Sequence, residues 1–477
     1  MISLIALLLA GPATTTGLPD VAPAHAQTPL VEPLTQAEVL QASARFAPQI
    51  IEALARVRQA QGRALSAEGA FDTVFDVDGR SRALGYYDGS VIETRATRPL
   101  TGNGGYLYGS YRASRGDFPI YEDQSYTNRL GELKVGALYS LLRDRLVDER
   151  RTRRVLAGGD LDLARFEAQA VAIGVQRRAI DAYQNWVAAG LRLRAYRELF
   201  ELAENRRGAI ARQVKLGARP DILLTENDQN LVRRRALVVR AEQDFQAAAN
   251  ALSLYYRDDA GRPLLVSAER LPTDAAALVG PAVSRAGPPW TRPDLQTLLI
   301  RIDQSVARLA LAENDLRSRL DLRAEIGKDV GPEGLGGRSR TPLETIVGFR
   351  FSVPLQNRTA KGRVAEARAE IDGLKARQQF LRDQIATEVE GINIAVAGAE
   401  RLVEAAEQER MLADRLAAAE RRRFQLGSSD FFLVNQREET ATDARVRLIE
   451  AQARIAASRA ELAAAVADRR ALGLTAR

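Results

Sequence analysis

Cysteine is absent from this chain, and its only histidine is His25, close to the N-terminus. Without cysteine there are no disulfides, thiolate nucleophiles or zinc sites built on sulfur. Catalytic triads that depend on an imidazole base are excluded from the rest of the chain as well. Any catalysis would have to use carboxylates, hydroxyls or the scarce lysines. We therefore expect a protein that is not an enzyme and that has no cofactor or metal site.

Long apolar runs are the second absence. After residue 27 the sequence has no apolar run of the roughly 18 residues that a membrane-spanning helix needs. A shorter apolar stretch, from Ile2 to Ala10, is followed by Ala24-His25-Ala26-Gln27. A short apolar core and a small-x-small site are typical of a secretory signal, although no basic residue precedes this core. We expect residues 1–26 to be a signal peptide that is cleaved on export.

A basic stripe of the kind that binds nucleic acid is also missing. The formal charge is +7, but the arginines are interleaved with glutamate and aspartate, and pairs such as Arg206-Arg207 are interpreted as solvated helix faces. We therefore expect no nucleic-acid partner. Aromatic residues make up only 6% of the chain, as is typical of long helices and coiled coils.

What the sequence does contain is an internal repeat. A short glycine-centred segment occurs twice, and Gly427 follows Gly217 by 210 residues (427 − 217). Each segment precedes an apolar heptad series, and all five heptad positions keep the same offset. The two series are Leu224, Leu231, Val238, Phe245 and Leu252, and Val434, Ala441, Leu448, Ile455 and Leu462. The chain is therefore predicted to repeat one structural plan.

Each glycine is preceded by a very long helical pattern, from about residue 145 to 214 and from about 358 to 424. At about 1.5 Å per residue each helix would be roughly 100 Å long. A glycine in the left-handed conformation commonly ends a helix, and the heptads beyond it predict a helix running back. The pattern predicts two antiparallel helical hairpins with tips at Gly217 and Gly427. The helices alone would equally fit a coiled coil without a channel.

Before each long helix the periodicity changes to strict alternation, which predicts strands with one apolar and one polar face. Four strands are predicted in this way, two in each half of the chain. Their apolar sets are Phe71, Thr73, Phe75 and Val77; Leu133, Val135, Ala137 and Tyr139; Leu320, Leu322, Ala324 and Ile326; and Val347, Phe349, Phe351 and Val353. Such strands suit a transmembrane barrel, or else a small soluble sheet beside the helices.

Four strands are too few to close a membrane barrel, and open edges are not tolerated in lipid. A barrel would have to be shared between subunits, and three chains with four strands each would give twelve strands. The glycine-rich segments 102–105 and 331–337 are predicted to be loops at the outer surface of this barrel.

Over nearly its whole mature length the chain resembles the TolC-like outer membrane factor family. The order helix, two strands, long helix, tip and returning helix occurs twice. Two local motifs carry the resemblance, the strand-to-helix junction Phe351-Ser352-Val353-Pro354-Leu355-Gln356-Asn357-Arg358 and the tip Arg423-Phe424-Gln425-Leu426-Gly427-Ser428-Ser429-Asp430-Phe431-Phe432. The resemblance implies a mainly α fold with a small β part. It also implies a homotrimer with an α-barrel and a shared twelve-stranded transmembrane β-barrel.

The resemblance further implies a location in the outer membrane, in contact with its lipid, and two protein partners: a periplasmic adaptor and an inner-membrane transporter. The implied adaptor-docking residues at the tips are Leu216, Gly217, Leu426, Gly427, Ser428 and Ser429. The family often carries an aspartate six residues after the tip glycine, where this chain has Leu223 and Leu433. Candidates for lining the periplasmic entrance instead are Glu226, Asp228 and Asp430, although each also suits a solvated helix.

The expected organisation is a first repeat over residues 27–255, an equatorial linker over 256–291, a second repeat over 292–468 and a tail over 469–477. The expected function is the channel of a tripartite efflux or type I secretion system, with a drug, metal or protein as cargo. The alternative is a periplasmic adaptor or a structural coiled coil without a pore, which would not need strand pairs in both halves.

Overall fold

The computed structural model describes residues 32–273, 275–278, 289–336 and 340–474. The predicted signal peptide and His25 lie outside these residues. Seven α-helices and six strands are described: α1 Gln36–Phe46, α2 Pro48–Glu68, β1 Val74–Ser81, β2 Ser90–Pro99, β3 Tyr106–Arg115, β4 Glu132–Ser140, α3 Glu149–Lys215, α4 Ile222–Ser253, α5 Pro293–Asp315, β5 Arg319–Asp329, β6 Glu344–Ser352, α6 Arg358–Gln425 and α7 Phe431–Ala465. Among the described helices, none is both long enough and apolar enough to cross a membrane.

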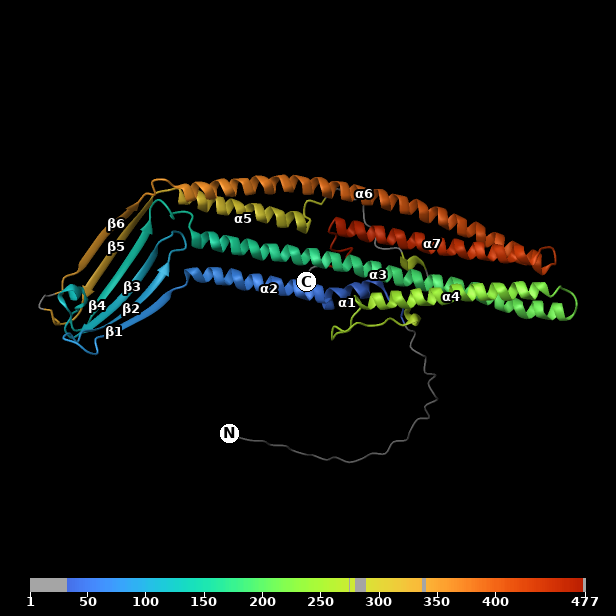
Figure 1. Ribbon diagram of the computed structural model, residues 1–477, viewed down its shortest axis with the longest axis horizontal. Helices are drawn as coiled ribbons and strands as arrows, with labels where there is room; N and C mark the ends of the chain where they lie inside the picture. Colours follow the sequence, from blue (N-terminus) through green and yellow to red (C-terminus); the bar gives the residue numbers. More distant parts are fainter. Residues whose placement is uncertain (1–31, 274, 279–288, 337–339, 475–477) are drawn as a thin grey trace, which may run out of the picture.

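Two very long helices, α3 with 67 residues and α6 with 68, determine the shape of the molecule (Figure 1). Each is flanked by two shorter helices, one beside the sheet and one beside the tip. Helices α2 and α4 contact α3, while α5 and α7 contact α6. The predicted mainly α fold with two antiparallel hairpins is confirmed, and the sheet and the hairpin tips lie at opposite ends of the molecule.

The seams between these helices are rich in alanine. Small side chains allow the helices to approach closely. In the second hairpin, a buried cluster near the tip consists entirely of alanines, namely Ala413, Ala417, Ala441 and Ala444. The hairpins are therefore held by close contact along their length and not by a thick apolar core.

The largest core lies midway along the molecule, where α3 passes the ends of α4 and α7. Trp186 has no exposed surface there, and its ring lies 6.0 Å from that of Phe245 and 6.2 Å from that of Tyr183. Leu252 of α4 and Ala463 of α7 belong to the same cluster. This core joins the two halves of the chain.

The predicted linker, residues 256–291, is anchored to α1 by a charged contact. Arg270 donates to both carboxylate oxygens of Glu38, at 3.1 and 2.8 Å, and the hydroxyl of Tyr256 donates to Glu38 at 2.7 Å. The hydrogen bond from Arg270 holds the pKa of the Glu38 carboxyl below its usual range. The described parts of the linker therefore contact the start of the first repeat.

The six strands form one antiparallel sheet in the order β1-β2-β3-β4-β5-β6. The prediction of four strands per chain is wrong, because β2 and β3 were missed. Their alternating positions hold small or weakly apolar residues such as Thr94, Ala96 and Gly109, so no apolar period stands out. The first strand also starts later than predicted, at Val74, since Phe71 ends a short 3₁₀ helix.

One of the two loops predicted at the outer surface, residues 102–105, lies instead at the end of the sheet beside the helices. Residues 102–105 join β2 to β3 beside the helices: the amide of Gly104 donates to Asp144 at 2.9 Å, and Arg151 of α3 donates to the carbonyl of Gly102 at 3.0 Å. This segment was expected at the outer surface. The inserted strands reverse the expectation, because β2 runs back from the far end of the sheet to the helices.

The central core predicts a large difference between the two tryptophans of the chain. Trp186→Ala should destabilise the protein by about 3–5 kcal/mol, because it leaves a cavity in a closed core. Trp290 is 50% exposed and serves as the matched control; Trp290→Ala should cost less than about 1 kcal/mol. Guanidinium unfolding of the purified protein, followed by circular dichroism, measures both. Equal shifts for the two variants would contradict the assigned core.

Candidate functional site

The two faces of the sheet have opposite chemistry across all six strands. Residues paired between neighbouring strands lie on the same face. One such row contains Phe75, Ala96, Gly109, Val135, Ile326 and Thr345. The adjacent row, on the other face, contains Asp76, Arg95, Ser110, Lys134, Gly327 and Glu344. The sheet is therefore amphipathic from one edge to the other, with the inserted β2 and β3 included.

The apolar face is exposed in the single chain. Phe349 is 77% exposed, Val347 68% and Val135 66%. Three basic residues, Arg98, Arg115 and Lys328, lie on the same face, each at or next to the last residue of its strand. Further exposed members are Phe75, Val77, Ile92, Leu107, Tyr111, Leu133, Tyr139, Leu322, Ile326 and Phe351. An uncovered apolar surface of this extent indicates contact with lipid or with protein.

The charged face is organised by ion pairs. Glu132 is bound by Arg112 at 2.7 Å and by Lys134 at 3.2 Å. Asp321 is bound by Arg319 at 2.6 Å. Pairing of this kind leaves a polar surface with few uncompensated charges, which suits contact with water.

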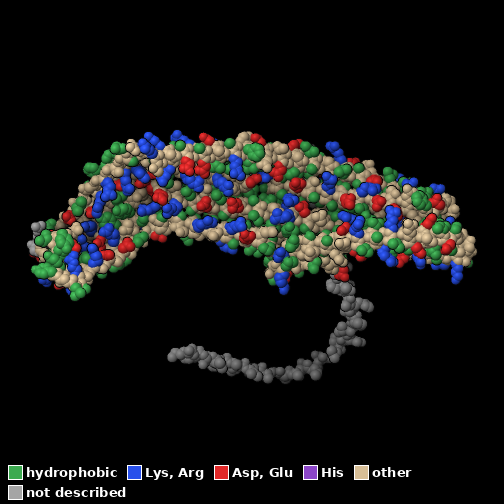
Figure 2. Space-filling view, viewed as in Figure 1, with side chains coloured by type: hydrophobic (Ala, Val, Ile, Leu, Met, Phe, Trp, Pro, Cys, Tyr) green, Lys and Arg blue, Asp and Glu red, His purple; other side chains and the backbone are tan. Residues whose placement is uncertain are grey.

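Hydrophobic side chains also gather at the end of the sheet that is far from the helices, whereas charged side chains of both signs are spread over the helices (Figure 2). In the loops that join β1 to β2 and β3 to β4, Leu84, Tyr86, Ile120 and Tyr121 are 80–94% exposed. The apolar character of the sheet therefore extends into its far loops.

At the opposite end of the molecule, both hairpin tips have the same backbone geometry. Gly217 and Gly427 adopt φ values of +70° and +76°. After each glycine the next amide donates to a carbonyl five residues earlier, Ala218 to Gln213 at 2.9 Å and Ser428 to Arg423 at 2.8 Å. This is the Schellman arrangement, in which a left-handed glycine satisfies the last carbonyls of a helix.

The side chains predicted to dock an adaptor differ in whether they make hydrogen bonds within the chain. Leu216 and Leu426 are 83% and 82% exposed. The Ser428 hydroxyl donates to the carbonyl of Arg423 at 3.0 Å, and the Ser429 hydroxyl donates to Glu420. The leucines therefore present apolar surface at the tips, whereas the serines stabilise the turn.

The three predicted entrance residues also differ. Asp430 caps α7 by accepting from the amide of Leu433 at 2.6 Å. Asp228 is bound by Arg207 across the first hairpin at 2.6 and 3.1 Å, and this hydrogen bonding holds the pKa of Asp228 below its usual range. Glu226 is exposed and makes no hydrogen bond or ion pair within the described part of the chain. Asp430 and Asp228 thus have local structural partners.

A buried charged cluster beside the tips was not predicted. Arg206 of α3 donates to Asn435 at 2.8 Å and to Glu438, both on α7. Arg234 of α4, only 1% exposed, donates to the carbonyl of Leu199 at 2.9 Å and lies 3.6 Å from Glu438. Burial lowers the pKa of Arg234, and the charge of Glu438 opposes this shift. The cluster fastens the first hairpin to the second.

The interpretation of Arg206-Arg207 as a solvated pair is therefore half wrong. Arg207 is exposed and binds Asp228, but Arg206 points inward and its side chain is only 12% exposed.

The two hairpins also make cation–π contacts near their tips. The guanidinium of Arg219 lies 5.6 Å from the ring centre of Phe424, and that of Arg206 lies 5.8 Å from the ring centre of Phe431.

Comparisons with solved structures identify the fold. The chain superposes on a membrane protein from Pseudomonas aeruginosa with a TM-score of 0.62 and 15% identity, covering 90% of this chain and 92% of the other. The outer membrane protein VceC from Vibrio cholerae gives 0.59 and 15%, covering 90% and 95%. The CmeC outer membrane channel of Campylobacter jejuni gives 0.59 and 14%, covering 98% and 96%. No protein-family model and no curated protein sequence matches the chain.

The chain has the fold of the TolC-like outer-membrane channels. The resemblance found in the sequence is confirmed at the level of the fold. This TolC-like fold accounts for the position of the amphipathic sheet at one end and the hairpin tips at the other.

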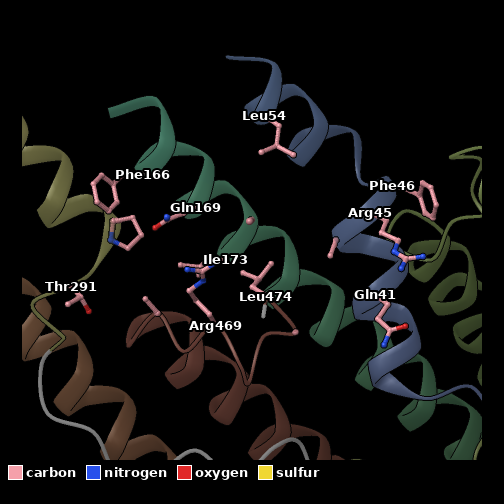
Figure 3. Close-up of a pocket in the computed structure, with 15 residues that line it drawn as sticks. Gln41, Arg45, Phe46, Leu54, Phe166, Gln169, Ile173, Thr291, Arg469 and Leu474 are labelled. Carbon is pink, nitrogen blue, oxygen red and sulfur yellow. The ribbon is translucent and has the colours of Figure 1, made fainter. Parts of the chain in front are cut away.

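A hollow near the middle of this TolC-like fold has a volume of about 1300 Å³. Figure 3 shows Arg45 and Phe46 on one side of it and Phe166 and Thr291 on the other. Among the described residues that line it there is no aspartate or glutamate, and Arg45 and Arg469 are its only charged members. The hollow therefore offers no carboxylate pair for acid–base chemistry.

The buried cluster predicts a stability difference between two acidic residues that correspond in the two repeats (438 − 228 = 210). Glu438→Ala leaves Arg206 and Arg234 without a carboxylate partner. Trypsin cleavage of the tips should accelerate by about tenfold or more, since an unpaired buried charge costs about 3–5 kcal/mol. Asp228→Ala removes only the exposed pair with Arg207 and should leave the rate almost unchanged. Similar rates for the two variants would contradict the bridging role of Glu438.

Proposed function

We propose that the chain is one subunit of a TolC-like outer-membrane channel, a passive conduit through which small molecules or proteins leave the cell. The observation that carries this proposal is the sheet, whose exposed apolar face and ion-paired opposite face run across all six strands. A sheet that meets lipid on one side and water on the other has this composition. Helices of about 100 Å would extend the conduit into the periplasm.

The channel is proposed to be a homotrimer, and exposed apolar residues on α6 support its association. Phe380, Ile394 and Leu402 are 69%, 65% and 52% exposed. An α-helix turns by about 100° per residue, and on this basis these three residues, Leu412 and Leu416 all lie within about 40° of one line drawn along the helix surface. Gly391 and Gly398 lie in the same stripe with open space beside them. A neighbouring helix could approach this face closely and cover it.

The partners and the location belong to the same proposal. The sheet would lie in the outer membrane, after export by the signal peptide at residues 1–26. The tips would dock a periplasmic adaptor, which connects the channel to an inner-membrane transporter in an efflux or type I secretion system. Leu216 and Leu426 are the best candidates for apolar docking contacts, because they are the large apolar side chains among the predicted tip residues and are 83% and 82% exposed. Glu226 stays the candidate for lining the entrance.

The rival proposal, a periplasmic adaptor or structural coiled coil without a pore, explains the hairpins equally well. It gives no role to an amphipathic sheet whose apolar face is uncovered over six strands. In water such a face would promote aggregation. The sheet therefore favours the channel.

Two neighbouring residues on β6 test this proposal. Val347 and Ile346 are both apolar and 68% and 43% exposed, but they lie on the apolar and the charged face respectively. Val347→Lys should reduce recovery of the protein from outer membranes, since a lysine facing lipid costs about 2–4 kcal/mol at mid-depth. Ile346→Lys should be recovered like the unmodified protein and should form discrete single channels in planar bilayers.

The two results separate the proposals. Equal recovery of both lysine variants as a water-soluble protein, with no conductance from the unmodified chain, would exclude the channel and favour the structural coiled coil. Discrete conductance from a purified trimer, lost only in Val347→Lys, is the expected outcome.

The tip leucines predict separate effects on docking and on conductance. The double variant Leu216→Asp with Leu426→Asp should keep its single-channel conductance but lose binding of the adaptor encoded in the same genome, because charge replaces the apolar contact. Val232→Asp, on the side of α4 and 71% exposed, is the control and should bind normally. Adaptor binding to the immobilised trimer measures this, and undiminished binding of the double variant would place docking elsewhere.

A further inference from the structure

The β2–β3 hairpin is built into the sheet, because its two strands lie between β1 and β4. Strand β2 pairs with β1 over eight residues, from Ser90 to Thr97, and β3 pairs with β4 over seven, from Tyr106 to Arg112. Strands β1 and β4 have no direct pairing. Removal of β2 and β3 from the sheet would therefore break it in two.

Side-chain contacts also hold the β2–β3 hairpin in place between β1 and β4. The hydroxyl of Tyr108 on β3 reaches across β4 and donates to Glu325 on β5. This reach depends on Gly136 of β4, where an added Cβ would lie 2.4 Å from the tyrosine ring. Arg112 of β3 binds Glu132 of β4 at 2.7 Å. The charged face is thus continuous through the inserted hairpin.

The turn between β2 and β3 is anchored in the same way. Asn103 is 3% exposed, donates to the carbonyl of Ser140 at 2.8 Å and accepts from the amides of Ser140 and Gly105, each at 2.9 Å. A buried asparagine whose side chain makes three hydrogen bonds fixes the turn at the end of β4. The hairpin is therefore held at its base as well as along both strands.

The two outer strands, β1 and β6, each pair with a strand on one side only, and the other edge of each has no strand partner within the described chain. Every residue of β1 is exposed, as are eight of the nine residues of β6. Because the sheet is antiparallel and has an even number of strands, β1 of one copy and β6 of the next run antiparallel when the copies are arranged in a ring. The apolar residues Phe75 and Val77 of β1 would then continue the apolar face of β6.

We propose that β1 of each copy pairs with β6 of the next and that the trimer therefore closes an eighteen-stranded barrel, three copies of six strands, instead of a barrel of twelve. This proposal rests on the proposed function, because only lipid requires every strand edge to be paired. At about 4.8 Å between strands and about 40° tilt, such a barrel is about 36 Å across at the backbone, against about 24 Å for twelve strands. The residues of β2 and β3 that lie on the charged face, such as Glu93 and Arg95, would line the water-filled lumen.

Disulfides introduced along one lipid-facing row test whether the hairpin belongs to the barrel. The unmodified chain has no cysteine, so the background is silent. Val77 pairs with Thr94, and Tyr111 with Leu133. In the membrane-embedded protein, Val77→Cys with Thr94→Cys should link within one chain, and so should Tyr111→Cys with Leu133→Cys. Val77→Cys with Leu133→Cys, three strands apart, is the matched control and should not link.

A second panel tests the closure between copies. Val77→Cys is combined in turn with Thr345→Cys, Val347→Cys, Phe349→Cys and Phe351→Cys, which together cover the possible registers of β6. At least one combination should give a covalently closed trimer on a denaturing gel, whereas Leu133→Cys with the same four should give no link between chains. Mass spectrometry of the linked peptides identifies the strands.

The outcomes distinguish this proposal from the proposed function. A strong link between Val77→Cys and Leu133→Cys, in a trimer that conducts, would show β1 beside β4; it would overturn the eighteen-stranded barrel and leave the channel intact. Absence of any β1–β6 link in a conducting trimer would also overturn the proposed closure. A monomer without conductance would overturn both proposals.

Discussion

The chemistry of the sheet constrains everything else in this protein. One face is apolar and exposed, and the opposite face is covered with ion pairs such as Arg112 with Glu132. Water cannot cover the first face favourably, and lipid cannot satisfy the edge strands. In a single copy the apolar face is uncovered and the two outer edges of the sheet are unpaired. The apolar stripe on α6 is likewise uncovered in one chain.

The long helices set the distance at which the two ends of the molecule operate. Alanine seams let α3 and α6 run close to their partners without a wide core, so the hairpins can be long and narrow. The core around Trp186 fixes the middle of the molecule, and the cluster of Arg206, Arg234 and Glu438 fixes the region beside the tips. The two hairpins are therefore joined at the middle of the molecule and again beside the tips. The described tip serines and Asp430 stabilise the turns, whereas Leu216 and Leu426 are exposed apolar side chains.

Much of this fold could be predicted from the sequence, because helices and strongly alternating strands are local patterns. The heptad offset located both tips, and the alternation around Val135, Ile326 and Phe349 located β4, β5 and β6. Strands β2 and β3 escaped, since residues such as Thr94, Ala96 and Gly109 give no clear apolar period. Missing them also placed the turn at residues 102–105 at the wrong end of the sheet. The buried cluster was missed for a related reason: Arg206 and Arg207 are neighbours in sequence, and only packing against α7 tells them apart.

The sequence by itself determined the two helical hairpins, their glycine tips and the amphipathic character of four strands, because each depends on the backbone conformation and spacing of residues close together in the chain. Only the tertiary structure decided that the sheet has six strands, that β2 and β3 separate β1 from β4, and that Arg206 and Arg234 meet Glu438 more than 200 residues away. Strand pairing and buried charge pairing join distant segments of the chain. Their energies depend on which surfaces come together, and no local period records that choice.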